Sequence, residues 1–491
     1  MQYSSLITSA LFLLSLSSSL AFTIPSSWDA LKLELDKDIQ PQLTTTSTCR
    51  LSAKDENYGA TSLALDPSLP VFYRDKNCIC AACESVWLAL ETKCVQYNTV
   101  LVDIDSNDSN SNDDVTITIP RITWPADDTS TNNNNNNNDD DATTINKNTA
   151  CNDPIQLLEQ IQKRYPDNPP NFYPSLSSAV DASRCNILRL PGVMPRNSDP
   201  ALQSLAPHLF RADGTRVKQS SHAVTLEEIE EMQEEYYLGD FLCGRDITAA
   251  DMIWGPYLER YAVQLPLVFP NKGRLNPRNR NVYQEVDNWY KVMEEGSSVP
   301  EYVCRVMGDE RHWRECLEVA VEIHNDRVEN EEERVSLVEV SEERGWWMKK
   351  MKKRFGNDVD KIWNEYSSKR SWVASTPGGE VSLFLLRNRE MIVDSAVAAQ
   401  GEEFGDNDSA DEALREVAQV LMEWDSTEES TNQTLSERGL KMALFVAEEI
   451  IHVPRDIGMI PSSVLWDAIW SSDAKEGESA NVEEQTKVAM S

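Results

Sequence analysis

Two cysteines in the spacing Cys80-x-x-Cys83 stand between a short apolar segment and an amphipathic pattern. The apolar residues 71–73 favour a strand, and the apolar spacing that begins at Cys83 is typical of a helix. Residues 97–103 then alternate like a second strand. The order strand, helix, strand predicts a β-α-β unit in which the chain passes from strand to helix at the two thiols.

Cys80 is the predicted nucleophile because it stands where this helix begins. At a helix N-terminus the unpaired N–H groups and the positive end of the dipole favour the thiolate over the thiol. Cys83, one turn later, is the candidate resolving thiol. Two alternatives stay open: a buried structural cysteine, and a metal site formed by Cys78, Cys80 and Cys83 with Cys94.

The composition excludes several classes of partner. The chain has 491 residues, of which 40% are hydrophobic, enough for two or three domains with real cores. Its formal net charge of -35 argues against nucleic acid and anionic membranes as partners. Ten cysteines over this length do not form the dense framework of a small disulfide-rich secreted domain, so we expect mostly free thiols.

The N-terminal residues predict a targeting sequence. Residues 6–16 form an apolar core, and the small residues before Phe22 predict a signal peptide over residues 1–21. The junction at Phe22 resembles the bipartite presequences of algae with secondary plastids, which predicts a plastid, with the endoplasmic reticulum or secretion as the alternative. Beyond the leader no uncharged run approaches the roughly 20 residues that span a bilayer, so we expect no membrane span in the mature protein.

The rest of the chain divides by composition and periodicity. Strand patterns occur in residues 115–119 and around Arg121, an Asn-rich insert follows, and Asp153 with Pro154 predicts a capped helix. Helical spacing dominates from there on. We predict a transit peptide or flexible arm over 22–70, an α/β domain over 71–167 with an insert at 126–151, an all-helical domain over 168–325, and an acidic helical extension over 326–491.

The motifs together resemble the glutathione transferase family. The strand, Cys80-x-x-Cys83, helix unit and the strand that ends on Ile119-Pro120 are similar to its N-terminal domain. Residues 241–254 resemble its helical capping motif, in which Thr248 caps a helix and Asp251 reaches back to it. The resemblance covers residues 71–318, and the cysteine-type, glutaredoxin-like branch is the nearest.

This resemblance implies a fold and a set of site residues. The fold would be an α+β thioredoxin-like N-terminal domain followed by an all-α domain, with the helical extension outside the similarity. Cys80 would face the glutathione sulfur and form a mixed disulfide with it. Ile119, before a cis Pro120, would pair its backbone with the tripeptide, and Asp153 would lie near its γ-glutamyl end.

The chain also departs from the family pattern. Ala81 and Ala82 replace the usual proline and aromatic residue, no counterpart of the second helix is present, and the Asn-rich insert precedes Asp153. Glutaredoxin-like proteins without that proline sometimes hold an iron-sulfur cluster between two chains, which is a further alternative. The family also admits a homodimer.

Two functions from different classes follow. The first is a glutathione-dependent thiol transferase or reductase acting on a small-molecule or protein disulfide, with conjugation of glutathione to electrophiles as a lesser variant. The second is a non-catalytic module for binding or assembly. Trp254, Tyr257 and Tyr261 favour a hydrophobic core over an electrophile pocket, and the basic residues 346–354 favour a solvated helix face.

Overall fold

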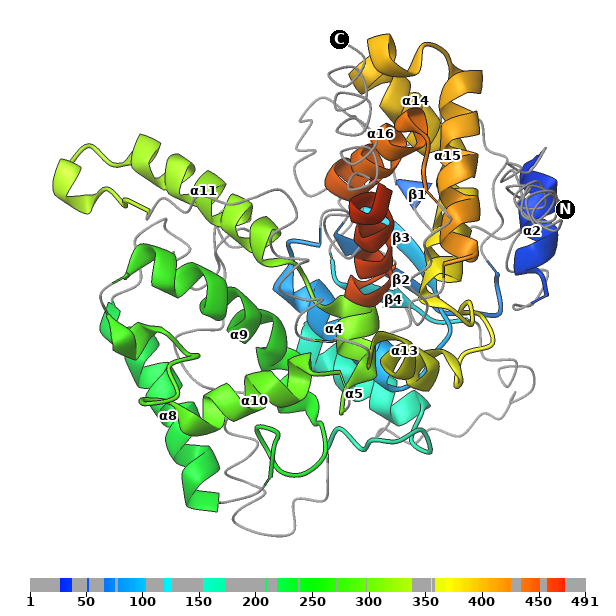
Figure 1. Ribbon diagram of the computed structural model, residues 1–491. Coiled ribbons are helices and arrows are strands. Elements are labelled where there is room, and N and C mark those ends of the chain that lie inside the picture. The colour runs from blue at the N-terminus through cyan, green and yellow to red at the C-terminus, as the bar shows by residue number, and fades with distance from the viewer. Residues whose placement is uncertain are drawn as a thin grey trace, which may run out of the picture.

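The computed structural model describes the chain in ranges separated by gaps (Figure 1). These ranges are residues 27–37, 51–52, 66–75, 78–102, 119–125, 153–173, 209, 219–236, 239–270, 272–296, 298–337, 355, 358–424, 434–450 and 457–472. The predicted signal peptide, the predicted strand at 115–118, the Asn-rich insert and the basic residues 346–354 lie outside them. Those predictions are neither confirmed nor contradicted by the structure.

The strands and the helices beside them come first along the chain. In order they are α2 (Trp28–Leu35), β1 (Leu51–Ser52), β2 (Val71–Asp75), α4 (Ala81–Thr92), β3 (Asn98–Val102), β4 (Arg121–Thr123) and α5 (Pro154–Arg164). A helical part follows with α8 (Gln219–Tyr236), α9 (Ala249–Val268), η2 (Gly273–Leu275), α10 (Gln284–Glu294), η3 (Tyr302–Val306), α11 (Glu310–Arg327) and η4 (Glu331–Glu333). The extension contains α13 (Val359–Ser367), α14 (Pro377–Phe404), α15 (Asn407–Met422), α16 (Glu437–Phe445), η6 (Val446–Ile450) and a helix over residues 459–472.

The described strands form one mixed sheet in the order β1-β3-β2-β4. Strand β3 is parallel to both β1 and β2, whereas β4 is antiparallel to β2 and pairs Arg121 with Tyr73. Two parallel neighbours need a crossover connection, and α4 supplies it between β2 and β3. The predicted β-α-β unit is therefore confirmed.

Helix α4 is buried on all sides, which explains its almost continuous apolar sequence. It packs against α5, α9 and η3, and Val86, Leu88 and Leu90 are fully buried. Figure 1 shows α4 and α5 next to the sheet, with α8, α9 and α10 on the side away from α14, α15 and α16. A helix enclosed in this way holds its first residue in a fixed position relative to the sheet.

The helix boundaries follow local sequence signals. Thr248 and Asp251 form a reciprocal capping box at the start of α9, as predicted. Asp153 caps α5 by accepting a hydrogen bond of 2.9 Å from the Ile155 amide, with Pro154 in the first turn. These caps confirm two of the sequence predictions at the residues that were named.

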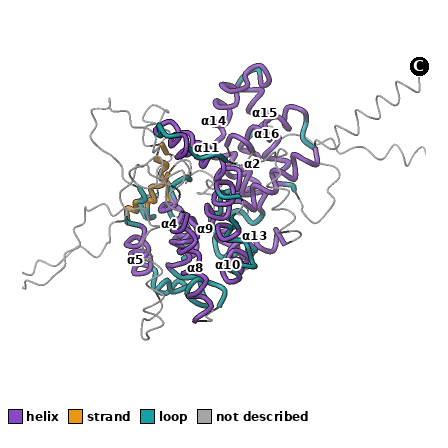
Figure 2. Tube along the Cα trace, turned by 90° about the vertical axis from the view of Figure 1, so that its left-hand side faces the viewer, coloured by secondary structure: helices purple, strands orange, loops and turns teal. Residues whose placement is uncertain are grey.

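The extension is part of the same hydrophobic core as the rest of the described chain. One continuous cluster of buried apolar side chains includes Phe72 of the sheet, Trp254 of α9 and Leu414 of α15. Helices α14, α15 and α16 lie together, apart from α8 and α10, in both views (Figures 1 and 2). The described extension is therefore packed onto the other helices and the sheet.

Two elements lie in the segment for which the sequence predicted a transit peptide or flexible arm. Strand β1 pairs with β3, and the indole nitrogen of Trp28 in α2 donates a 2.7 Å hydrogen bond to Asp411 in α15. Two described elements therefore precede Pro70. The segment gave no strong signal because β1 has only two residues and α2 gains its stability from tertiary packing.

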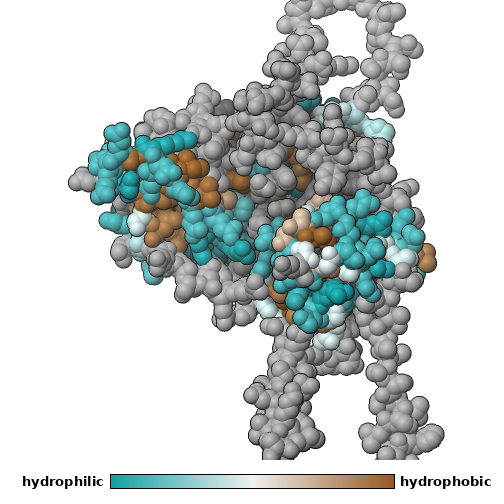
Figure 3. All heavy atoms as spheres, turned by 90° about the horizontal axis from the view of Figure 1, so that it is seen from above, coloured by the Kyte–Doolittle hydropathy of each residue, from teal (hydrophilic) through white to brown (hydrophobic). Residues whose placement is uncertain are grey.

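The described surface is mainly hydrophilic, with smaller hydrophobic areas on the face seen in Figure 3. Among the described residues, the large apolar side chains that are exposed are Leu33, Val224, Val282 and Val319. Among the described helices, none combines the length and the apolar character that a bilayer crossing requires.

Candidate active site at Cys80

The connection from β2 to α4 is held by a carboxylate at the end of the strand. Oδ2 of Asp75 accepts hydrogen bonds from the amides of Ile79, at 2.5 Å, and Cys80, at 3.1 Å. Cys78 has a φ of 55°, a left-handed conformation that turns the chain between strand and helix. The backbone that leads into Cys80 is thus fixed by its hydrogen bonds to Asp75.

Cys80 is the N-cap of α4, and its side chain caps the first turn. The sulfur accepts a 3.4 Å hydrogen bond from the Cys83 amide. Hydrogen bonding from the Cys83 thiol and amide, together with the positive charge of Arg260, outweighs burial and the charge of Asp75, so that the pKa of Cys80 is lowered from its ordinary value. Cys80 is half-buried, which leaves part of it accessible to solvent.

Cys83 has the opposite character. It is buried, and burial together with hydrogen bonding to Cys80 raises its pKa well above the ordinary value. Because Cys83 keeps its proton, its thiol can donate a hydrogen bond to the sulfur of Cys80, whose pKa is lowered. The two cysteines are therefore unequal, because the pKa of Cys80 is lowered and that of Cys83 is raised.

A buried ion pair lies behind the first turn of α4. Nη1 of Arg260 on α9 is 2.7 Å from Oε2 of Glu84, and both side chains are almost fully buried. Nη2 of Arg260 donates a 2.8 Å hydrogen bond to the carbonyl of Ile79. Burial raises the pKa of Glu84 to about 8, although the neighbouring Arg260 opposes this rise.

The third thiol of the segment has a separate environment. Nη1 of Arg74 donates a 3.0 Å hydrogen bond to the sulfur of Cys78, and the guanidinium lies 4.4 Å from the ring centre of Trp87. Arg74 and Cys78 are both buried. We interpret this pair as support for the turn at the end of β2.

The cis proline lies at the same edge of the sheet as Cys80. The peptide bond between Ile119 and Pro120 is cis, as predicted. Because Arg121 pairs with Tyr73 in an antiparallel ladder, Pro120 stands level with the carboxyl end of β2, from which the chain runs to Cys80. Pro120 and Cys80 therefore both lie at the carboxyl end of β2.

Asp153 begins the helix that packs beside α4. Nζ of Lys93, just after α4, donates a 3.2 Å hydrogen bond to the carbonyl of Tyr165, just after α5. The last turns of α4 and α5 are thus adjacent, and the two helices have similar lengths. We infer that their first turns, which carry Cys80 and Asp153, are directed toward the same end of the domain.

The alternative of a metal site that includes Cys94 is wrong. Cys94 follows the far end of α4, which is about 18 Å long at 1.5 Å per residue. Its thiol donates a 3.2 Å hydrogen bond to the carbonyl of Lys369 in the extension. Within the described ranges, no group of three or more His, Cys, Asp or Glu side chains is arranged to hold a metal ion.

The aromatic residues of α9 belong to the core. Trp254 and Tyr261 are fully buried, and Tyr257 is 7% exposed. Burial, and then the charge of Cys80, raise the pKa of Tyr257. The preference for a hydrophobic core over an electrophile pocket is consistent with this burial.

Sequence reasoning missed three residues of this site: Asp75, Glu84 and Arg260. Each is a charged residue within a segment that is otherwise buried. Such residues are rarely buried without a partner, so a charge on an apolar face was the available signal. The partner of Arg260 could not be found locally, because Glu84 precedes it by 176 residues.

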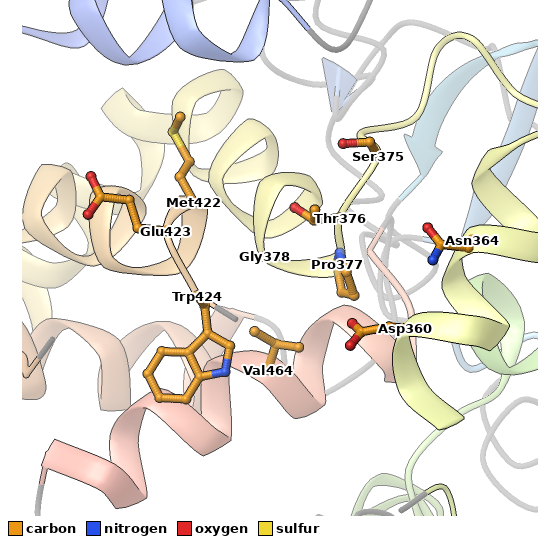
Figure 4. Close-up of a pocket in the computed structure, with 10 residues that line it drawn as sticks. All are labelled: Asp360, Asn364, Ser375, Thr376, Pro377, Gly378, Met422, Glu423, Trp424 and Val464. Carbon is orange, nitrogen blue, oxygen red and sulfur yellow. The ribbon is translucent and has the colours of Figure 1, made fainter. Parts of the chain in front are cut away.

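A separate cavity of about 340 Å³ lies in the extension. It is bounded by α13, the start of α14, the end of α15 and Val464 (Figure 4). In this view Asp360 points toward Pro377 and Val464, whereas Glu423 points away from them. None of the lining residues belongs to the Cys80 site.

Comparison with known proteins gives a limited similarity in fold. No family model and no curated protein matches the chain. The solved structures similar to it include a trimeric glutathione transferase of Leishmania, with 12% identity, a TM-score of 0.34 and coverage of 52% of this chain and 49% of that protein. The present chain thus spans about half the length of the Leishmania protein.

Two further solved structures are similar over the same share of the chain. Glutathione transferase Omega 3C from Trametes versicolor has 14% identity, a TM-score of 0.33 and coverage of 52% of this chain and 92% of its own. A delta-class glutathione transferase from Nilaparvata lugens has 15% identity, a TM-score of 0.32 and coverage of 53% and 100%. At these values the similarity carries no argument about activity, which depends on the residues of this chain.

Proposed function

We propose that this protein is a glutathione-dependent thiol transferase with Cys80 as its nucleophile. The observation that carries the proposal is the pair of unequal thiols, in which a half-buried sulfur caps the start of α4 and has a lowered pKa, while the pKa of its buried neighbour is raised. Acidity and access are the two properties that a thiol needs for disulfide exchange.

The reaction has two steps. The Cys80 thiolate attacks the glutathione sulfur of a mixed disulfide, the sulfur-sulfur bond breaks, and the substrate leaves as a thiolate that takes up a proton. A second glutathione thiolate then attacks the Cys80 adduct and releases oxidised glutathione, which restores the Cys80 thiolate. Cys83 has a proposed secondary role as a resolving thiol, although its burial makes the direct attack by glutathione the main route.

Glutathione would bind at the sheet edge beside Cys80. The backbone of Ile119, before the cis Pro120, would pair with the tripeptide, and Asp153 would lie at its γ-glutamyl end. The side chain of Asp153 already accepts the Ile155 amide through Oδ1. A carboxylate has lone pairs for further donors, so this capping bond is compatible with binding an ammonium group.

The test is reduction of hydroxyethyl disulfide by glutathione. We expect activity in the wild type, none above the protein-free rate in Cys80→Ser, and retained activity in Cys83→Ser. Cys94→Ser is the control, because Cys94 lies at the other end of α4 and serine keeps its hydrogen bond to Lys369. Equal rates in the wild type and Cys80→Ser would reject the enzyme and favour the non-catalytic module.

A further inference from the structure

Arg260 contacts the Cys80 site at two points and also stacks on Trp313 of α11. Its two terminal nitrogens bind Oε2 of Glu84 and the carbonyl of Ile79, and the guanidinium lies 3.8 Å from the ring centre of Trp313. Nη1 also donates a 2.7 Å hydrogen bond to the carbonyl of Pro256, one turn earlier on α9. The side chain is fully buried, so its position is set by these contacts.

Ile79, the residue before Cys80, is therefore hydrogen-bonded at both of its backbone polar groups. Its N–H binds Asp75 and its carbonyl binds Arg260. Because the carbonyl of Ile79 belongs to the peptide group that carries the Cys80 amide, fixing it orients the first turn of α4. Lysine cannot replace this function, because only the planar guanidinium fork binds a carboxylate and a carbonyl together.

The ionisable groups around Cys80 include anions, a cation and groups that stay neutral. Asp75 on β2 and Glu84 on α4 are negative when ionised, Cys83 and Tyr257 keep their protons, and Arg260 on α9 is the cation that favours the Cys80 thiolate. Arg260 itself faces two further acidic groups, Glu259 and Cys316. Glu84 thus both holds Arg260 in place and offsets its charge.

We propose that Arg260 is the positioning residue of Cys80, and that Glu84 is the counter-ion that limits its effect on the thiolate. This inference rests on the proposed role of Cys80 as a nucleophile. It assigns to a buried ion pair two separable effects on one sulfur, a geometric effect through Ile79 and an electrostatic effect through charge.

An ion pair that only stabilises the fold gives a different expectation. Loss of either partner would then loosen the site in the same way and shift the acidity of Cys80 in the same direction. An electrostatic role requires opposite shifts over the pH range in which Glu84 is ionised, because Arg260→Met removes a positive charge and Glu84→Gln there removes a negative one. The amide oxygen introduced by Glu84→Gln would still accept a hydrogen bond from Arg260, so this variant is the milder of the two changes.

The experiment is the pH dependence of Cys80 alkylation by iodoacetamide, followed by peptide mass spectrometry. We expect Arg260→Met to raise the midpoint by about one pH unit, which slows alkylation about tenfold below the midpoint. We expect Glu84→Gln to lower the midpoint. Arg260→Lys keeps the charge and should keep the midpoint near the wild-type value, while thiol transfer falls several-fold because the Ile79 carbonyl loses its donor.

Arg278→Met is the matched control. Arg278 also pairs with a buried glutamate, Glu294, and lies 4.4 Å from the ring centre of Tyr290, but it does not contact the Cys80 site. We expect Arg278→Met to leave the pH midpoint of Cys80 alkylation unchanged. Circular dichroism establishes whether each variant is folded. If Arg260→Met does not fold, Glu84→Gln and Arg260→Lys carry the test.

Midpoints that stay unchanged, or that move in the same direction in the two charge-removing variants, would overturn the inference. The alkylation readout requires no glutathione, so it is independent of the proposed enzyme activity. A wild-type midpoint in the ordinary range of cysteine would reject the proposed function, and the direction of the variant shifts would still decide the role of Arg260.

Discussion

Arg370, in the loop before α14, donates a 2.5 Å hydrogen bond from Nη2 to the carbonyl of Glu91, near the end of α4. The hydroxyl of Tyr366 also donates to the carboxylate of Glu91, at 2.9 Å. The extension thus binds the end of the helix whose first turn carries Cys80. This contact joins the extension to the part of the chain that contains α4.

Loss of this contact should destabilise the whole protein. Arg370 is fully buried and lies near two carboxylates, those of Glu91 and Glu301. Arg370→Ala leaves buried charge without its partner, which costs about 3–5 kcal/mol. Arg274→Ala, which removes an exposed pair with Glu227, should cost less than about 1 kcal/mol. Denaturant unfolding measures both, and equal effects would contradict the buried role of Arg370.

The packing of α14 against α15 depends on the absence of a side chain at Gly378. A Cβ there would lie 2.0 Å from the carbonyl oxygen of Leu421, and backbone atoms cannot yield as a flexible side chain does. Gly378→Ala should lower the free energy of unfolding by more than about 2 kcal/mol. Gly401→Ala, in the same helix with no atom within 4 Å, should be neutral or slightly stabilising.

Asp309 should make stability depend on pH. Burial raises its pKa to about 8 in the folded protein, whereas the unfolded chain has the ordinary value. Between these two values the folded state holds the proton and the unfolded state has lost it, so the stabilising contribution of this group falls as pH rises, by up to about 1.4 kcal/mol per pH unit.

Asp309→Asn isolates this contribution. Asparagine also caps helices and can accept the hydrogen bond from the His312 amide, so the cap at the start of α11 is kept. The variant should match the wild type near pH 3.8, the ordinary pKa of the group, and exceed it in stability by a margin that grows up to about pH 8. A stability difference that stays constant over this range would contradict the raised pKa of Asp309.

The support that Cys83 gives to Cys80 should depend on a donor. The largest cause of the lowered pKa of Cys80 is hydrogen bonding from the Cys83 side chain. Cys83→Ala removes this donor and should raise the pH midpoint of Cys80 alkylation, whereas Cys83→Ser keeps an O–H donor and should raise it less. Alkylation kinetics rank the three proteins, and identical midpoints would show that the Cys83 thiol has no such effect.

Much of the site could be predicted because its signals are local. The cap formed by Asp153 and the reciprocal pair of Thr248 and Asp251 each depend on neighbouring residues, whereas the cis bond at Pro120 was implied by the family resemblance. Short-range signals of this kind follow from the hydrogen bonds that a helix end or a turn requires. The position of Cys80 at the start of α4 was predictable for the same reason.

The remaining features depend on long-range contacts that no local pattern encodes. The pairing of Arg260 with Glu84, and of Arg370 with Glu91, joins residues more than 170 positions apart. The contribution of β1 to the sheet rests on pairing with β3, not on the propensity of its two residues. Tertiary packing decides elements of this kind, so the sequence of residues 22–70 gave no signal for α2 or β1.

The central claim is that Cys80 is an accessible thiolate that exchanges with glutathione. The direct measurement is incubation of the reduced, folded protein with oxidised glutathione, followed by peptide mass spectrometry. We predict a glutathione adduct on Cys80 and none on the buried Cys83, Cys304 and Cys316, whose pKa values are raised. An unmodified Cys80 in the folded protein, together with modification of the same residue after denaturation, would contradict the claim.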